Sequence, residues 1–298
     1  MISSISQIHA LATQKTKKKI VLAAAHDVHA LEALSAACIK GIVNAVLVGD
    51  EKIINALKVQ YKLKLENAII INEPDVDKAA AISVKLVRDA EADILMKGNI
   101  PTANLLKAVL NKEFGLRAGE LLSHLAIFQL KNYHKILAVT DAAMNIAPDF
   151  AAKIAIIKNA VDYLNKLGIA KPKVAVLGAV ETVNESMPLT LEAAALSKMA
   201  ERNQLKNCII DGPLAFDNAI DKTSAEHKGI VSPVAGDADL LMCPTLEAAN
   251  ILYKSFIFFA NAQCAAVIVG AKAPIVLTSR ADSDETKLNS IALAAAIN

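Results

Sequence analysis

A run of polar and turn-forming residues, from Asp211 to Asn218, carries the clearest sign of chemistry in this chain. It follows residues 208–210, a short apolar run typical of a buried strand. The order Asp-Gly-Pro predicts that this strand stops in a turn, after which Asp217 and Asn218 add a carboxylate and an amide. In open α/β sheets, ligands bind beyond the carboxyl ends of the strands. The segment is therefore a candidate binding site, and an ordinary tight turn explains it about equally well.

A second apolar run, residues 275–277, leads to Ser279 and Arg280. The planar guanidinium of an arginine matches the oxygens of a phosphate, and a neighbouring hydroxyl can donate a hydrogen bond to a developing oxyanion. This pair predicts a site for a small anionic substrate. From spacing alone, a Ser-Arg turn with Arg280 in a salt bridge is the commoner explanation.

After Ala281, four polar residues follow that pair: Asp282, Ser283, Asp284 and Glu285. Asp282 and Glu285 have the spacing of a capping box, which predicts a helix starting near Ser283. Acids in a first turn also interact favourably with the helix dipole. A carboxylate beside Ser279 and Arg280 could instead act as a general base, although capping is the commoner role for each acid.

Other polar residues follow further predicted strands. Lys97 and Asn99 come after residues 94–96 and before a helix that could bind an anion with its amide groups. The segment is not a phosphate-binding P-loop, because the GxxxxGK[ST] spacing is absent, and the chain has no GxGxxG dinucleotide motif. Further polar strand ends contain Asp141 and Asn145, Glu181 and Asn184, and His26 with Asp27, where a lone histidine is more often structural than catalytic.

Composition narrows the class of protein. The 298 residues are 54% hydrophobic and 21% charged, as in an ordered globular protein of about two domains. A net charge of +2 and only 4% aromatic residues, with no tryptophan, give no support for nucleic-acid binding. The four cysteines lack metal-ligand spacing and lie in apolar segments, which favours buried thiols and a cytoplasmic location. Residues 257–277 are interrupted by polar residues and a proline, so we predict no membrane span.

Apolar runs and helical patterns alternate along the whole chain. This order predicts an α/β fold with a largely parallel sheet covered on both faces. The apolar run at residues 256–259 could lie in the core or at a subunit interface. We expect strands at residues 20–24, 45–48, 68–71, 94–96, 136–139, 174–177, 208–210, 239–242, 267–269 and 275–277, and helices at 28–40, from 52, around 77–89, at 102–111, 148–167 and 189–203, and from 246 and 283.

Taken together and in this order, several of these segments resemble the phosphate acyltransferase family, and within it the butyryl type. The resemblance covers nearly the whole chain. It implies two α/β/α domains of the isocitrate/isopropylmalate dehydrogenase-like type with a cleft between them. The expected domains are residues 1–137 with 275–298, and residues 138–274. The resemblance depends on residues 96–98, 140–148, 179–184, 211–219, 236–239, 250–254 and 273–280.

The resemblance also implies a reaction. Short-chain acyl-CoA, expected to be butyryl-CoA, and phosphate interconvert with acyl phosphate and CoA, with coenzyme A as a substrate and no metal or other cofactor. Ser279 and Arg280 would be catalytic. The related acetyltransferases have an Asp where this chain has Thr286, so the base is open, with Glu285 preferred over Asp282 or Asp284. Substrate-binding residues are expected to be Lys97, Asn99, Asp141, Asn145, Glu181, Asn184, Asp211, Pro213, Asp217, Asn218 and Lys272.

Other functions remain open at this level. The first is a phosphate acetyltransferase that uses acetyl-CoA. A metal- and NAD-dependent dehydrogenase or decarboxylase of the same fold could use Asp211 and Asp217 as metal ligands, but no nicotinamide site is evident. A regulatory module that senses CoA or acyl phosphate is the non-enzymatic alternative. We expect a homodimer or a higher homo-oligomer.

Overall fold

The computed structural model describes residues 2–14, 16–277 and 282–297. It has a mixed α/β fold, as predicted, and the chain forms two compact units. One, called here the terminal unit, comprises Ser6–Gly119 and Ala265–Asn298. The other, the central unit, comprises Met1–Ile5 and Glu120–Cys264. The domain boundaries predicted from the sequence, after residues 137 and 274, stay a prediction.

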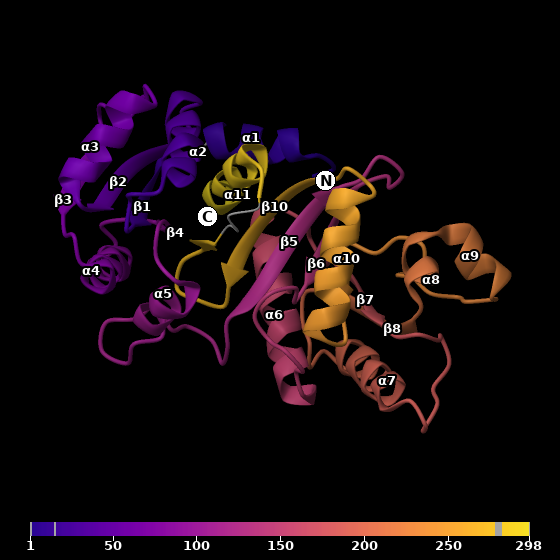
Figure 1. The fold of residues 1–298 in the computed structure, drawn as a ribbon. Helices are drawn as coiled ribbons and strands as arrows, with labels where there is room; N and C mark the ends of the chain where they lie inside the picture. The colour runs from indigo at the N-terminus through magenta and orange to yellow at the C-terminus, as the bar shows by residue number, and fades with distance from the viewer. Residues whose placement is uncertain (1, 15, 278–281, 298) are drawn as a thin grey trace. The chain divides into compact units, whose positions relative to one another are not determined.

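The terminal unit has the strand order β3-β2-β1-β4-β11-β10. Neighbouring strands from β3 to β11 are parallel, and β10 is antiparallel to β11. In Figure 1, α2 and α11 lie together on one side of these strands, and α4 and α5 lie on the other. The strands are β1 Lys18–Ala23, β2 Val43–Gly49, β3 Ile69–Asn72, β4 Ile94–Lys97, β10 Gln263–Val269 and β11 Ile275–Val276. The helices are α1 Ile5–Gln14, α2 Val28–Ile39, α3 Glu51–Gln60, α4 Val76–Arg88, α5 Thr102–Val109 and α11 Asp284–Ala296.

The central unit has the strand order β5-β6-β9-β7-β8. The strands from β6 to β8 are parallel, whereas β5 runs antiparallel to β6. The carboxyl ends of β6, β9, β7 and β8 therefore share one edge, and β5 begins at that edge. The strands are β5 Ser123–Gln129, β6 Ile136–Thr140, β7 Lys173–Leu177, β8 Ile209–Leu214 and β9 Leu240–Met242. The helices are α6 Phe150–Leu167, α7 Pro188–Glu201, α8 Phe216–Ile220, α9 Lys222–His227 and α10 Leu246–Phe258.

Short polar side chains explain where several helices begin. The carboxylate of Asp27 accepts a hydrogen bond from the amide of Ala30, so Asp27 is the N-cap of α2. Asp149 caps α6 in the same way, and the hydroxyl of Thr245 caps α10. Such caps satisfy amide groups that the first turn of a helix leaves without a partner. They fix the points at which the chain turns from a strand end into the next helix.

The prediction of a turn at Asp211 was wrong, because β8 continues through Gly212 and Pro213 to Leu214. Proline has no amide hydrogen to donate, but β8 is the last strand in the order of its unit, where a proline is tolerated. The pairing of β8 with β7 also shifts register between Ala175 and Leu177, which accommodates the irregular segment. Asp211 is therefore a strand residue rather than a turn residue.

The predicted capping box at Asp282 and Glu285 was also wrong. The N-cap of α11 is Ser283, whose hydroxyl oxygen accepts a hydrogen bond from the amide of Thr286 at 3.1 Å. The predicted start of this helix is nevertheless confirmed, and Glu285 lies in its first turn. Strand β5 and helices α1, α8 and α9 were not predicted. Among the described helices, none has the length and apolar character needed to cross a membrane.

Candidate active site

The loop that follows β6 is built around the buried carboxylate of Asp141, which is 3% exposed. Its oxygens accept hydrogen bonds from the amides of Ala143, Met144 and Asn145 at 3.0–3.2 Å. They also accept one from the side-chain amide of Asn145 at 2.5 Å. With so many donors engaged, Asp141 fixes the loop rather than offering its own oxygens to a substrate.

Asn145 is brought to Asp141 as the sequence predicted. Its side-chain amide also donates to the carbonyl oxygen of Leu122, just before β5. On the other side, Asn250 of α10 donates to the carbonyl oxygen of Ala142. The loop is thus held between the start of β5 and the first turns of α10, at the carboxyl edge of the central strands.

His124 lies at this edge and was missed by sequence reasoning. Its ring is buried, and its Nδ1 atom has no hydrogen-bond partner among the residues that the structure describes. Burial lowers the pKa of His124, and the charge of Asp141 acts in the opposite direction. The ring also packs edge-on against Tyr253 of α10. Thr140, Asp141 and His124 are therefore buried together at the end of β6.

A second polar group joins the ends of β7 and β8. Asn218 of α8 is fully buried and its side-chain amide donates to Glu181 at 3.4 Å. Glu181 also accepts from the ammonium of Lys228 at 3.0 Å, and this hydrogen bond lowers the pKa of Glu181. The carbonyl oxygen Oδ1 of Asn218 is buried and has no hydrogen-bond partner among the described residues. Glu181 and Asn218, both predicted site residues, are therefore in contact.

The remaining predicted residues of this edge are less closely joined. The Oδ1 atom of Asp211, within β8, accepts from the amide of Gly212 at 2.8 Å, and Pro213 beside it is buried. Asp217 is exposed in the first turn of α8. Asn184 is exposed in the loop after β7, where its main chain bonds to Thr190. Among the described residues, no recorded hydrogen bond or ion pair joins Asp211 to Asp217.

The terminal unit has its own carboxyl edge, which contains Lys97 and Asn99. The amides of Gly98 and Asn99 donate to the carbonyl oxygens of Ala23 and Ala24, at the end of neighbouring β1. A side chain at position 98 would place its Cβ atom 2.4 Å from the Ala24 carbonyl oxygen, so only glycine fits there. The Lys97 ammonium lies 3.2 Å from the Gly98 carbonyl oxygen. This close approach holds Lys97 and Asn99 at the strand ends.

The catalytic pair predicted from the sequence follows the neighbouring strand. β11 is parallel to β4, with Val276 opposite Met96, so the chain leaves β11 at the edge where Lys97 lies. Ser279 and Arg280 come three and four residues after Val276 and lie outside the described residues. Lys272, in contrast, lies in the turn before β11, at the opposite edge, and is exposed.

Glu285, the preferred candidate for the general base, is exposed in the first turn of α11. Thr286 follows it, and its hydroxyl lies 3.0 Å from that of Ser283. The neighbouring Asp284 lies with His29 and Glu32 in a cluster whose ligand atoms are within 4.8 Å of one another. Such a cluster has the donor atoms for a metal ion, but His29 and Asp284 are exposed, and exposed acidic groups commonly occur without a metal.

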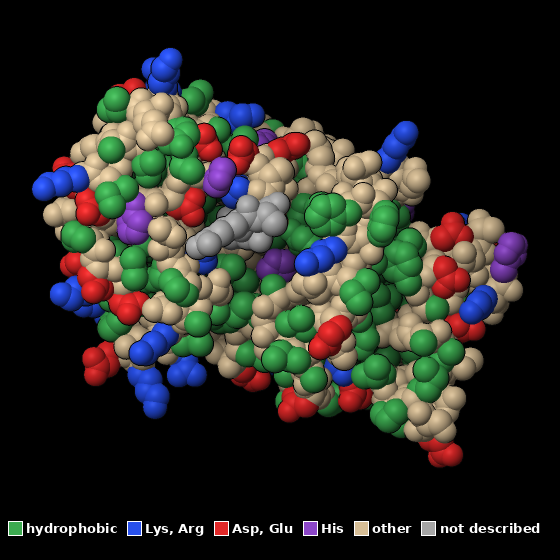
Figure 2. All heavy atoms as spheres, in the orientation of Figure 1, with side chains coloured by type: hydrophobic (Ala, Val, Ile, Leu, Met, Phe, Trp, Pro, Cys, Tyr) green, Lys and Arg blue, Asp and Glu red, His purple; other side chains and the backbone are tan. Residues whose placement is uncertain are grey.

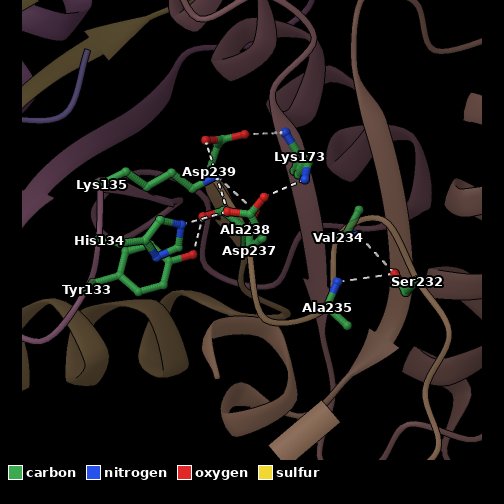
Figure 3. Close-up of polar contacts among 10 residues, drawn as sticks. All are labelled: Tyr133, His134, Lys135, Lys173, Ser232, Val234, Ala235, Asp237, Ala238 and Asp239. Atoms are coloured by element: carbon green, nitrogen blue, oxygen red, sulfur yellow. Dashed lines mark hydrogen bonds and ion pairs between the residues drawn. The ribbon is translucent and has the colours of Figure 1, made fainter. Parts of the chain in front are cut away.

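A third polar cluster, drawn in Figure 3, lies where β6, β7 and β9 begin, which is the amino edge of the central strands and opposite to the Asp141 loop at the end of β6. Lys135 is 2.7 Å from Asp239 and 2.9 Å from Asp237. Lys173 and His134 also contact Asp237, and the Tyr133 hydroxyl donates to the Ala238 carbonyl oxygen at 2.6 Å. Burial would raise the pKa of Asp237, but hydrogen bonds from its cationic neighbours lower it well below its usual range. This cluster ties together the starts of β6, β7 and β9, which indicates a structural role.

Comparisons with known proteins identify the family of this chain. The sequence matches the phosphate acetyl/butaryl transferase family over residues 3–82 and 73–295. It is 44% identical over 297 residues to a phosphate butyryltransferase of Clostridium acetobutylicum, covering 100% of this chain and 99% of the relative. It is also 44% identical over 278 residues to a phosphate acetyltransferase of Thermotoga maritima, covering 93% and 94% of the two chains.

Solved structures also include a phosphotransacylase similar to this chain. A branched-chain phosphotransacylase from Enterococcus faecalis V583 superposes with a TM-score of 0.82 at 33% identity, covering 93% of this chain and 97% of that chain. A putative 4-hydroxythreonine-4-phosphate dehydrogenase from Salmonella typhimurium has a TM-score of 0.60 at 14% identity, which shows a likeness of fold alone. The protein is therefore an enzyme of the phosphate acyltransferase class. More narrowly, the chain belongs to the phosphate acetyl/butaryl transferase family.

Proposed function

We propose that the protein transfers a short-chain acyl group, butyryl, between coenzyme A and phosphate. Butyryl-CoA and phosphate would give butyryl phosphate and CoA, and the reverse. The observation that carries this proposal is 44% identity to a phosphate butyryltransferase over the whole chain. A phosphate acetyltransferase is the alternative, since a relative of that name is equally identical over a slightly shorter region.

In the direction of acyl-CoA synthesis, the CoA thiolate attacks the acyl carbon and the bond to the phosphate oxygen breaks. The phosphate leaves with the bonding electrons. Arg280 would hold this phosphate and balance its charge, because a guanidinium forms paired hydrogen bonds with phosphate oxygens. Ser279 would donate a hydrogen bond to the carbonyl oxygen of the acyl group or orient the thiol. These roles come from the family resemblance and from the place of both residues in the sequence, three and four residues after the end of β11.

The remaining residues would bind and orient the substrates. Lys97 and Asn99 lie at the strand edge by which the chain leaves β11, which suits binding of an anionic group. Asp141 and Asn145 would shape the loop after β6, and Glu181 and Asn218 would do so after β7 and β8. Glu285 would accept the proton of the CoA thiol. A thiol with a pKa near 8.5 is partly ionised at neutral pH, so the base contributes less here than it would for a serine nucleophile.

The proposal includes the setting in which the enzyme works. Coenzyme A is a substrate, and the acyl-transfer chemistry described here requires no metal or other cofactor. The family's two-domain architecture, with domains 1–137 with 275–298 and 138–274, remains part of the proposal. Free cysteines, including the buried Cys243 and Cys264, favour a cytoplasmic location. We further propose that the protein forms a homodimer or a higher homo-oligomer.

Two measurements test this function. The first is a ranking of acetyl-, propionyl-, butyryl- and valeryl-CoA by kcat/KM with saturating phosphate. Butyryl-CoA should rank first, and a clear preference for acetyl-CoA would make the chain an acetyltransferase. The second is the phosphate dependence of Arg280→Ala, whose rate should fall by about 10²–10³-fold through phosphate use. Near-normal phosphate kinetics in that variant would exclude Arg280 as the phosphate-binding residue.

A further inference from the structure

His124, the second residue of β5, is a buried side chain at the carboxyl edge of the central strands. The residue is only 6% exposed, yet no hydrogen bond is recorded for its ring among the residues that the structure describes. Leaving a buried polar group unpaired destabilises a fold, and native proteins contain few such groups. An unpaired imidazole at a strand edge of this kind points to a partner that binds there.

Two other buried side-chain atoms lack a hydrogen-bond partner among the described residues, one on His26 and one on Asn218. His26 is only half-buried, and the side-chain amide of Asn218 already donates to Glu181. Of these three residues, His124 alone combines nearly complete burial with a side chain for which no hydrogen bond is recorded. It is therefore the strongest candidate for a group that is kept for a ligand.

The main chain around His124 is held from two sides, which fixes the position of the ring. The hydroxyl of Thr140, at the end of β6, donates to the His124 carbonyl oxygen at 2.8 Å. The side-chain amide of Asn159, on α6, donates to the carbonyl oxygen of Leu121 at 3.0 Å and to the hydroxyl of Ser123 at 3.1 Å. A donor that is fixed before the substrate arrives needs no reorganisation during the reaction.

Helix α10 supplies an apolar side to the surroundings of the ring. Tyr253 packs edge-on against His124, with ring centroids 6.0 Å apart. Phe128 lies on the same face of β5, because strand side chains alternate, and contacts both Tyr253 and Phe256. In Figure 1 α10 lies along β5 and β6, and Figure 2 shows mainly hydrophobic side chains over this helix. Apolar surroundings strengthen a hydrogen bond, so one made by this ring is stronger than in water.

The ring of His124 is mainly uncharged at neutral pH. Burial lowers its pKa, and the charge of Asp141 acts in the opposite direction. The carboxylate of Asp141 accepts its recorded hydrogen bonds from its own loop, and none joins it to the ring among the described residues. A neutral imidazole has one N–H group, which can donate a hydrogen bond. Because Nδ1 is enclosed, Nε2 is the nitrogen that can reach a ligand.

An uncharged N–H beside Asp141 suits a carbonyl oxygen better than a phosphate. The negative charge of Asp141 would repel a phosphate, and the neutral ring brings no charge to balance this repulsion. The acyl carbonyl of an acyl-CoA is uncharged before the reaction and gains negative charge only during it. Preorganised donors aimed at such an oxygen usually act together, and Ser279 is so far the one donor assigned to it.

We propose that His124 is a further catalytic residue, whose Nε2–H donates a hydrogen bond to the carbonyl oxygen of the acyl group. A phosphate oxygen attacks the acyl carbon, and the carbonyl oxygen takes up the displaced electron pair. This pair returns as the bond from carbon to sulfur breaks, and CoA leaves as a thiolate. His124 keeps its proton throughout, and its hydrogen bond strengthens as the charge on the oxygen grows. The inference rests on the acyl transfer proposed above.

Kinetics of His124→Phe test this role. Phenylalanine keeps the size of the ring but has no N–H, so kcat for phosphate-dependent CoA release should fall by about 10²–10³-fold, with KM for phosphate changed by less than about 2-fold. The melting temperature should stay the same or rise, because an unpaired polar group is removed. His124→Leu should behave in the same way, whereas His124→Gln, whose amide can place an N–H near Nε2, should recover at least about 10-fold of the lost rate.

His134→Phe is the matched control, since the side chain of His134 is 59% exposed and lies just before β6, at the opposite edge. Its kcat per folded molecule should equal that of the wild type. A folded His124→Phe or His124→Leu variant with kcat within about 3-fold of the wild type would overturn the proposal. So would a rise in KM for butyryl-CoA at unchanged kcat, because it would show a contact that does not strengthen in the transition state.

Two unreactive analogues locate the contact without turnover. The ketone analogue of butyryl-CoA has a methylene in place of the sulfur and keeps the carbonyl, whereas S-butyl-CoA is a thioether that lacks it. In calorimetric titrations, His124→Phe should bind the ketone about 5-fold more weakly than the wild type does, and S-butyl-CoA equally well. An equal loss for both analogues, or a loss for neither, would refute the contact with the carbonyl. Wild-type protein that binds both analogues with this pattern but releases no CoA with phosphate would instead refute the proposed reaction.

Discussion

Removal of the Lys135 ammonium should destabilise the central unit strongly. Lys135 is 7% exposed at its side chain and contacts Asp239, which is 9% exposed, at 2.7 Å (Figure 3). In Lys135→Met, Asp239 would remain buried with the amide of Lys173 as its recorded donor, at 2.8 Å. Breaking a buried ion pair by removing one partner typically costs about 3–5 kcal/mol.

For Lys135→Met we expect a loss of stability at the lower end of that range. Asp237, the second carboxylate near Lys135, is 38% exposed and keeps its contacts with Lys173 and His134. Water screens such a partly exposed pair, so losing it contributes little. We therefore expect Lys135→Met to lower the free energy of unfolding by about 3 kcal/mol.

Urea unfolding at neutral pH measures this change, with Lys166→Met as the control. Lys166 pairs with Asp162 at 2.7 Å on the surface of α6, and losing such an exposed pair costs about 0.5 kcal/mol or less. Asp239→Asn added to Lys135→Met should recover part of the loss. Because the cluster lies at the amino edge, kcat/KM per folded molecule should stay unchanged. A loss below about 1 kcal/mol, or a large fall in kcat/KM, would refute this reasoning.

Three further predictions follow from particular contacts. In the folded protein the pKa of Asp237 is lowered, whereas in the unfolded chain an aspartate has a pKa of about 3.9. The ionised carboxylate therefore stabilises the fold above about pH 3.9, and this contribution is lost as the pH falls. Between about pH 6 and pH 3, the free energy of unfolding measured in urea should fall more for the wild type than for Asp237→Asn. Gly98→Ala should cost about 1–3 kcal/mol and raise KM for phosphate, because the new Cβ atom would meet the Ala24 carbonyl oxygen; a variant with wild-type melting temperature and KM would contradict this. Glu285→Gln should reduce kcat by about 10-fold or more at an unchanged melting temperature, whereas the adjacent Asp284→Asn should not, and equal rates would exclude Glu285 as the base.

Periodicity and capping residues were sufficient to predict much of the fold. The apolar runs that became β1, β4 and β7 are buried on both faces, so they stand out as uninterrupted stretches. The helix beginning at Leu246 follows Thr245, a side chain that caps it as such residues usually do. Strong local signals of this kind depend little on the rest of the chain.

The errors arose where tertiary structure overrides the local signal. Asp-Gly-Pro is a turn sequence by itself, yet at the edge of the central strands it continues β8 with a register shift. Strand β5 begins with Ser123 and His124, polar residues that are buried because β5 pairs with β6. The burial of these two side chains depends on how β5 packs in the folded unit, which the pattern of a single strand does not reveal.

The candidate site was predictable only in part, because strand order locates the strand ends but not the residues that pack against them. Strand ends that a parallel sheet gathers at one edge can be found from the order of strands, and this rule located Asp141 and Asn145, and Glu181 and Asn218. The partners of these groups, Lys228 and His124, carry no sequence signal, because their positions depend on packing. Lys272 came from the resemblance and lies at the other edge of its strands.

The central claim is that phosphate accepts the acyl group, and thiol release from butyryl-CoA tests it most directly. The purified protein is mixed with butyryl-CoA, and CoA thiol is followed with and without phosphate in metal-chelated buffer. We predict release that requires phosphate, saturates with it, and yields one butyryl phosphate for each CoA. Release that proceeds equally well without phosphate, or no release from butyryl-CoA or acetyl-CoA at any phosphate concentration, would contradict the account.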